Sequence, residues 1–113
     1  MSNLQILDLS DNLISGSIPD IIGLTSLKFL DLSVNSIKGL LPLGLAVLTV
    51  SHMDFSNNNI SGNIPKSLFN PYLKFLKLSH NHLEGTIPTE IGRITLQNVY
   101  VEERFIINQL FKF

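Results

Sequence analysis

The stretch "LSDNLISGSIPD", residues 9–20, combines loop-forming residues with bulky aliphatic ones. Gly and Pro usually interrupt regular structure, yet leucine and isoleucine side chains continue through this segment. Closely similar stretches occur at residues 32–43 ("LSVNSIKGLLPL"), 55–66 ("FSNNNISGNIPK") and 78–89 ("LSHNHLEGTIPT"), and each starts 23 positions after the one before. A fixed period of this length predicts a solenoid, in which every repeat forms one turn of a coil.

Six positions of the repeat are apolar in all four turns, which makes 24 apolar residues without an exception. Because the whole chain is only 44% hydrophobic, chance would produce this agreement very rarely. We therefore expect these side chains to face inward. The columns recur at the same fixed interval and begin at Leu4, Leu7, Leu9, Ile14, Ile18 and Ile22.

The polar and special residues of the repeat also have predictable local roles. The alternation in Leu7-Asp8-Leu9 predicts a short strand, and stacked turns would place such strands about 4.8 Å apart in a parallel sheet. An Asn amide after each strand can satisfy backbone groups that no ladder reaches. The Gly column permits a backbone conformation closed to other residues, and the Pro column ends regular pairing. The structural Asn ladder comprises Asn12, Asn35, Asn58 and Asn81.

This pattern resembles the plant-type leucine-rich repeat, written LxxLxLSxNxLSGxIPxxLG, over residues 4–92. The resemblance implies a leucine-rich repeat solenoid: a right-handed α/β-type superhelix with short parallel strands on its concave face and about 4.5 repeats, each 23 positions long. The subclass normally has one residue more in each repeat. Residues 1–95 are expected to form four repeats, and residues 96–113 a degenerate fifth repeat with an apolar tail, in which Arg104 replaces the Asn.

The tail "FIINQLFKF", residues 105–113, has two open interpretations. It would either fold over the last turn as a cap or form an apolar end with no role.

Composition excludes several classes of function. A chain of 113 residues leaves no room for a separate catalytic domain, and a net charge of −1 gives no electrostatic footprint for nucleic acid. No apolar stretch approaches the roughly 20 residues of a membrane helix, and the start of the sequence lacks the features of a signal peptide. We therefore expect no direct membrane insertion by this chain. Cysteine is absent, whereas the resemblance implies Cys-paired caps in extracellular members, so uncapped turns should expose apolar edges and favour self-association.

Outward-facing strand positions form the candidate ligand-binding surface, because the resemblance implies binding on the concave face. One column contains three carboxylates, which would favour a basic or hydrogen-bond-donating ligand group. A neighbouring column has two phenylalanines flanking a histidine, which would give such a ligand an apolar contact. The alternative is that the aspartates are solvated framework residues and that the aromatic residues serve packing. The predicted site comprises Asp8, Asp31, Asp54, Lys77, Phe29, His52 and Phe75.

No catalytic or metal-binding arrangement is recognisable. In "HNH", residues 80–82, Asn81 has a structural role, and the two histidines lack a third ligand at a suitable spacing. No catalytic triad, phosphate-binding Gly loop or enclosed carboxylate pair is present. We therefore expect no cofactor, no metal and no enzymatic activity. A glycosylation sequon, "NIS", makes Asn59 a candidate for a sugar projecting from the loop after the third strand, if the protein is secreted.

Three hypotheses about function remain open. The resemblance implies a binding module similar to the ectodomain of a plant receptor-like kinase or receptor-like protein, extracellular or at the plasma membrane. It would recognise a peptide or protein ligand, or a co-receptor, in signalling or defence. The second hypothesis is an inhibitor of a secreted enzyme such as a polygalacturonase, and the third is a truncated fragment without a partner of its own.

Overall fold

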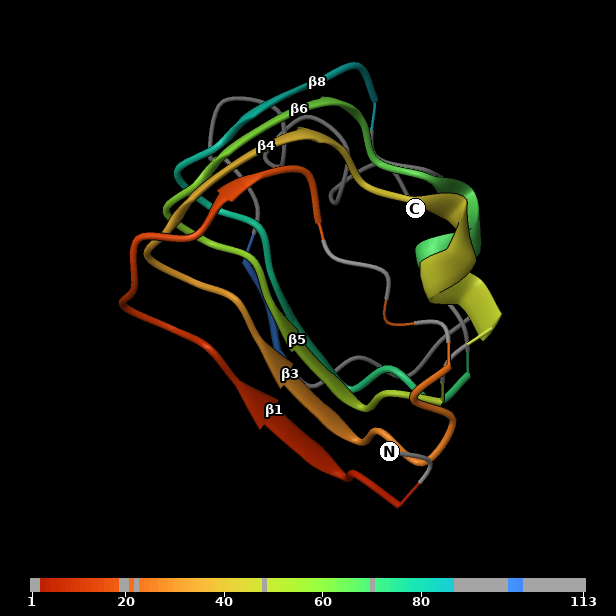
Figure 1. Cartoon of the computed structure of the whole chain (residues 1–113). Coiled ribbons are helices and arrows are strands. Elements are labelled where there is room, and N and C mark those ends of the chain that lie inside the picture. Colours follow the sequence, from red (N-terminus) through yellow and green to blue (C-terminus); the bar gives the residue numbers. More distant parts are fainter. Residues whose placement is uncertain are drawn as a thin grey trace.

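The fold is a coil of stacked turns with three sides (Figure 1). A computed structural model describes residues 3–18, 21, 23–47, 49–69, 71–86 and 98–100. Each full turn passes through a strand of one sheet, a strand of a second sheet and an irregular or helical return segment. The predicted leucine-rich repeat solenoid is therefore confirmed.

The first sheet has five parallel strands, one from each successive turn. Its pairing joins residues 23 positions apart, as in Ile6 with Phe29 and Asp8 with Asp31, so equivalent repeat positions lie side by side. The last strand continues this register one turn further along the chain, within the segment expected to form a fifth repeat. The strands are β1 (Ile6–Asp8), β3 (Phe29–Asp31), β5 (His52–Asp54), β7 (Phe75–Lys77) and β9 (Asn98–Tyr100).

The second sheet is a feature that the sequence interpretation missed. Its four parallel strands join residues 21 positions apart, as in Lys38 with Asn59 and Ser61 with His82. Pro does end the pairing as predicted, because the strands stop shortly before Pro42 and Pro65. The strands are β2 (Ser15–Gly16), β4 (Ser36–Leu40), β6 (Asn59–Asn63) and β8 (His82–Glu84).

Short 3-10 helices occupy the third side of the coil in two turns (Figure 1). They are η1 (Leu43–Val47) and η2 (Lys66–Leu68). Each directs one leucine of the predicted inward column into the core, since Leu45 and Leu68 are buried. The core fills the space between the three sides and includes inward side chains from every complete turn described.

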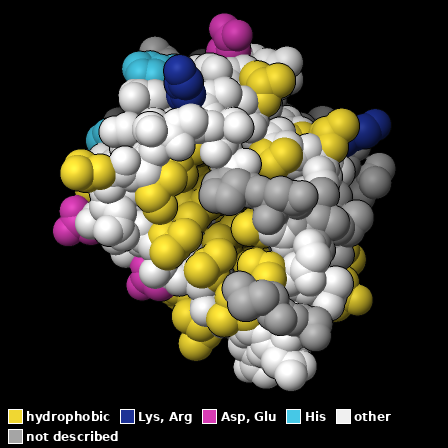
Figure 2. All heavy atoms as spheres, viewed as in Figure 1, with side chains coloured by type: hydrophobic (Ala, Val, Ile, Leu, Met, Phe, Trp, Pro, Cys, Tyr) yellow, Lys and Arg dark blue, Asp and Glu magenta, His cyan; other side chains and the backbone are white. Residues whose placement is uncertain are grey.

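The first turn is less buried than those behind it. Its inward residues are only partly covered, whereas Leu30, Met53 and Leu76, which repeat the position of Leu7, are fully buried. Figure 2 shows hydrophobic side chains gathered at this end of the coil. The expected apolar edge is confirmed for this turn, while the opposite end, the tail and Arg104 lie outside the described residues.

The Asn column connects successive turns through its side-chain amides. Asn58 is buried, and its Oδ1 accepts a hydrogen bond from the Ile37 N–H at 3.0 Å, in the preceding turn. Its Nδ2 donates to the carbonyl of Leu32 in that turn at 2.9 Å and to two carbonyls of its own turn at 3.1 and 3.2 Å. Asn35 and Asn81 repeat this arrangement. The predicted role of the ladder is confirmed.

Two further columns require a left-handed backbone. Gly16, Gly39, Gly62 and Gly85 have φ values between 82° and 91°, as predicted. A second column has φ values of 56° to 59° without glycine: Asp11, Val34, Asn57 and His80. Asn, Asp and His tolerate this region, but a β-branched residue such as Val34 is strained there.

Replacement of the buried Asn58 by Ala should lower the free energy of unfolding by about 3 kcal/mol or more. The change leaves the Ile37 N–H and several carbonyls without partners in the interior, each at a cost of roughly 1–3 kcal/mol. Asn12→Ala is the matched control, because the exposed Asn12 side chain donates to carbonyls of its own turn. Urea unfolding followed by circular dichroism measures both, and equal losses would contradict the assigned role.

Val34→Asn should raise the free energy of unfolding by about 1 kcal/mol, because Asn accepts the left-handed conformation that strains valine. The reverse change in the next turn, Asn57→Val, should lower it by a similar amount. Both side chains are exposed, so little packing changes. A higher melting temperature for the first variant and a lower one for the second are expected, and the opposite order would refute the strain.

Candidate functional site: the concave face of the first sheet

Three stacked rings cross the first sheet and form the aromatic strip, defined as Phe29, His52 and Phe75. The His52 ring lies 4.2 Å from the Phe29 ring, at an interplanar angle of 16°, and 4.2 Å from the Phe75 ring, at 1°. Strand pairing places Ile6, which is 65% exposed, beside Phe29 at one end. Since the rings cover one another's faces and are half-buried, they offer mainly their edges to a ligand.

The aspartate column, defined as Asp8, Asp31 and Asp54, lies on the same face two residues further along the strands. Oδ1 of each accepts two hydrogen bonds from the serine two positions later. The backbone N–H donates at 2.9–3.0 Å and the hydroxyl at 2.6 Å. These carboxylates are therefore framework groups, because their hydrogen bonds fix the backbone conformation after each strand.

The hydrogen bonds from Ser10 also lower the pKa of the Asp8 carboxyl. Donation by the Ser10 hydroxyl, followed by the Ser10 N–H, holds the pKa of the Asp8 carboxyl below its ordinary value of 3.8, against a smaller opposing effect of desolvation. The exposed carboxylate consequently stays ionised to a lower pH than a free aspartate.

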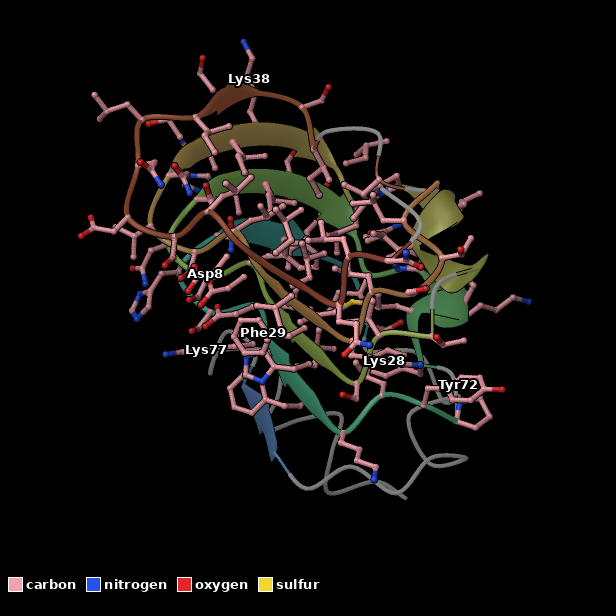
Figure 3. All side chains as sticks on the ribbon, turned by 60° about the horizontal axis from the view of Figure 1, so that its bottom comes forward. Asp8, Lys28, Phe29, Lys38, Tyr72 and Lys77 are labelled. Atoms are coloured by element: carbon pink, nitrogen blue, oxygen red, sulfur yellow. The ribbon has the colours of Figure 1, made fainter. Side chains whose placement is uncertain are left out.

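The fourth turn reverses the charge of this column. Lys77 pairs in register with Asp54, and Tyr100 follows in β9. Figure 3 shows Asp8, Phe29 and Lys77 near one another on one side of the molecule, with Lys38 of the second sheet well apart from them at the top of the view. The structure thus brings all seven predicted ligand-binding residues onto one sheet, as an apolar strip beside a column that changes from acidic to basic.

Geometry sets what this face can recognise. Neighbouring strands are about 4.8 Å apart, so the apolar row formed by Ile6 and the aromatic strip extends roughly 14 Å across four strands. Residues within a strand are about 3.3 Å apart, so this row lies about 7 Å from the aspartate column. An extended segment crossing the strands would meet apolar and charged groups side by side. Asp8 is exposed and Asp31 and Asp54 are half-buried, so these carboxylates lack the enclosure of a catalytic cleft.

Other candidates from the sequence are placed as follows. The described residues contain no group of three or more His, Cys, Asp or Glu side chains able to hold a metal ion. Asn59 is exposed but begins strand β6, so the expectation that it lies in a loop was wrong: the second sheet extends into this segment. Its glycosylation stays a prediction. Within the described part of the chain, no helix has the length and apolar character needed to cross a membrane.

Comparison with protein families gives the relationship directly. Residues 2–44 match the family described as Leucine Rich repeats (2 copies), and residues 49–71 and 72–94 each match Leucine Rich Repeat. The chain belongs to the leucine-rich repeat family. Its repeats are of the plant type. A search of curated proteins found no match.

Solved structures of plant receptors share this fold. The ectodomain of the membrane receptor kinase GASSHO1/SCHENGEN3 from Arabidopsis thaliana, in complex with CASPARIAN STRIP INTEGRITY FACTOR 2, aligns with a TM-score of 0.85 and 35% identity over 89% of this chain. PEPR1–AtPEP1 aligns with a TM-score of 0.85 and 31% identity over 88% of it. The ectodomain of the receptor kinase SOBIR1 from Arabidopsis thaliana aligns with a TM-score of 0.76 and 29% identity over 92%.

The leucine-rich repeat chain is short beside these receptors. The alignments cover 13% of the GASSHO1/SCHENGEN3 chain, 15% of the PEPR1 chain and 59% of the SOBIR1 chain.

Removal of the Ser10 hydroxyl should move the pKa of Asp8 upward toward its ordinary value. The folded-state pKa is lowered, so the contribution of Asp8 to stability is complete above about pH 3.8 and is lost as the pH falls through the folded-state value. In Ser10→Ala the contribution should therefore be smaller, and the part that the Ser10 N–H still supplies should be lost at a higher pH than in the unmodified chain. NMR titration of the Asp8 carboxyl carbon measures the shift. Ser79→Ala is the control, since Lys77 occupies the aspartate position of that turn, and an unchanged Asp8 pKa in Ser10→Ala would contradict the assigned cause.

Proposed function

We propose that this leucine-rich repeat chain is a recognition module that binds an extended peptide or protein segment on its concave face. One observation carries the proposal: the aromatic strip and the aspartate column lie in register on the same sheet. An apolar side chain of the ligand packs across the ring edges, and an Arg or Lys of the ligand pairs with a carboxylate about 7 Å away.

Each half of this surface supplies something that the other lacks. The rings exclude water and give contact area, and the carboxylates give charge selectivity. Because Oδ1 of each aspartate is already occupied by serine donors, the ligand's cation meets Oδ2 of a carboxylate whose orientation is fixed in advance. This pre-organisation lowers the entropy cost of binding. Lys77 sets a boundary, because it repels a cation at the fourth strand and favours an acidic group there.

Related structures support this choice among the hypotheses. GASSHO1/SCHENGEN3 was solved in complex with CASPARIAN STRIP INTEGRITY FACTOR 2, and HAESA with the peptide hormone IDA and the co-receptor SERK1. Those ligands belong to those proteins. By analogy, we propose that this chain acts outside the cell or at the plasma membrane, in the signalling or defence role of a receptor-like protein and with a peptide, protein or co-receptor as its partner.

The properties of the concave face favour binding over catalysis. The candidate residues lie on an open sheet and are tied into local hydrogen bonds, so the proposal is recognition without enzymatic activity. Receptor-type recognition is preferred to inhibition of a polygalacturonase because receptor ectodomains with bound peptides are among the similar structures. Self-association through the open apolar end of the coil stays a prediction, which sedimentation velocity over a concentration series would detect.

Replacing Phe29 and Phe75 together by Ala should weaken binding at least tenfold, about 1.4 kcal/mol, because the ring edges form the apolar contact. The probe is a randomised heptapeptide display library selected on the unmodified chain, which should enrich peptides that combine an apolar residue with Arg or Lys. Fluorescence polarisation then measures the affinity of selected peptides for each variant. Leu13→Ala is the matched control, because Leu13 is 93% exposed and lies outside the first sheet.

A second variant separates charge from folding. In Asp31→Asn with Asp54→Asn, the amide Oδ1 still accepts the serine hydrogen bonds, so the fold is kept and only the negative charge is lost. Basic peptides should then bind at least tenfold more weakly. Equal affinities for all variants would contradict the proposed site, provided that thermal melts show intact folding.

A further inference from the structure

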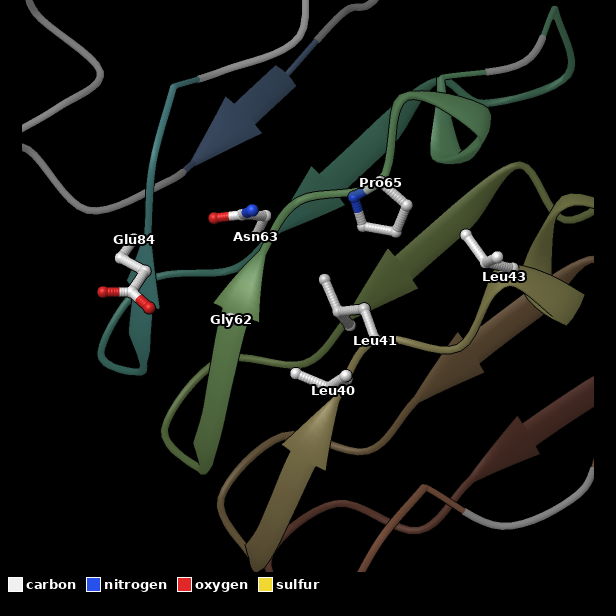
Figure 4. A pocket seen from close by; sticks show the side chains of 7 residues that line it. All are labelled: Leu40, Leu41, Leu43, Gly62, Asn63, Pro65 and Glu84. Atoms are coloured by element: carbon white, nitrogen blue, oxygen red, sulfur yellow. The ribbon is translucent and has the colours of Figure 1, made fainter.

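A shallow hollow of about 440 Å³ lies on the second sheet (Figure 4). We define it as the lateral hollow. Glu84 lies at one end with Asn63 beside it, and the apolar side chains of Leu40, Leu41, Leu43 and Pro65 line the rest. The residues come from β4, β6 and β8 and the segments that follow β4 and β6. The lateral hollow thus belongs to a different side of the coil from the aromatic strip.

Leucine at two of these positions is unexplained by the fold. Leu40 is 67% exposed and Leu43 is 73% exposed. The other turns contain polar residues in the same two columns: Ser17, Asn63 and Thr86 in the first, and Asp20, Lys66 and Thr89 in the second. The other three turns therefore show that the solenoid forms with polar residues at these two positions. Two exposed leucines in one turn indicate a requirement other than core packing.

The side chain of Leu40 contacts strand β6 of the next turn. A Cβ added at Gly62 would collide with Cδ2 of Leu40, so the leucine side chain lies directly over the glycine of the next turn. In the following turn, Asn63 lies over Gly85 in the same way. Leu40 therefore contacts the neighbouring strand while most of its side chain stays exposed.

The charge of the lining is negative. Among the described residues that line the hollow, Glu84 is the only charged one, and it pairs in register with Asn63, which adds a polar amide. From Leu40, the ladder crosses to Ser61 and then to His82, and Glu84 lies two residues further along β8. With strands about 4.8 Å apart and residues about 3.3 Å apart, the apolar and acidic ends are separated by roughly 12 Å.

We propose that the lateral hollow binds a segment of a partner protein in which a Leu, Ile or Phe side chain is followed, two to four residues later, by Lys or Arg. The apolar side chain packs between Leu40 and Leu43. The cation reaches Glu84, because an extended segment advances about 3.3 Å per residue and Lys and Arg side chains are long. This surface is separate from the concave face, so both can be occupied at once.

The test uses fluorescein-labelled octapeptides with one Leu, Ile or Phe and one Lys or Arg at these spacings in a Ser-Gly background. Fluorescence polarisation up to about 1 mM peptide should show saturable binding to the unmodified chain. The variant Leu40→Asn with Leu43→Lys copies the residues of the third turn and should weaken binding at least tenfold while it keeps its thermal melt. Glu84→Lys should reverse the preference, so that peptides with Glu in place of Lys bind better.

Matched controls separate this site from the concave one. Leu13→Ala, an exposed leucine away from the hollow, should leave octapeptide binding unchanged. Repeated in the Phe29→Ala, Phe75→Ala background, which weakens the concave face, the titrations should still show the loss on Leu40→Asn with Leu43→Lys and the reversed preference in Glu84→Lys. Three results would overturn the proposal. They are no saturable binding to the unmodified chain, equal affinity of the Leu40→Asn, Leu43→Lys variant, and an unchanged peptide preference in Glu84→Lys. Sedimentation velocity adds one further outcome: a dimer of the unmodified chain that this variant abolishes would assign the surface to a second copy and would also overturn it.

Discussion

The hydrogen bonds of the buried asparagine side chains are the constraint on which the rest of the coil depends. A solenoid turn must bend sharply after its strand, and the bend leaves backbone groups in the interior that no sheet can satisfy. Asn58 and its equivalents meet this need with one amide that bonds its own turn and the turn before it. Because every such amide connects two turns, the spacing of the stack and the register of both sheets are fixed together.

That fixed register gives the concave face its chemistry. Equivalent positions are direct neighbours, so a residue repeated in the sequence becomes a continuous column in space. The rings of Phe29, His52 and Phe75 stack for this reason, although each is a whole repeat away from the next along the chain. The aspartates show how one column combines two tasks, because Oδ1 secures the backbone through serine while the negative charge remains on the outer surface.

The period and the residue types predicted most of the fold. The inward columns, the Asn ladder, the left-handed glycines and the members of the concave face were all readable, since each depends on a residue type recurring at a fixed interval. The second sheet was missed because its strands are short and contain residues of low strand propensity, such as the Asn and Gly of "NISGN" in β6. The serine bonds to the aspartates follow from "DLS" and "DFS", where a carboxylate precedes a hydroxyl by two positions. The lateral hollow depends on how Leu40 rests on Gly62 in the next turn, a contact that no single repeat reveals.

The two sheets differ in register, because partners lie 23 positions apart in one and 21 positions apart in the other. Duplication of a turn would therefore have unlike effects on the two sides. On the first sheet it would add a rung to each existing ladder and lengthen the same surface. On the second sheet like residues meet on a diagonal, so each junction between turns brings together residues from different columns. A residue type repeated at the 23-residue period therefore forms a straight column across the first sheet and a diagonal one across the second.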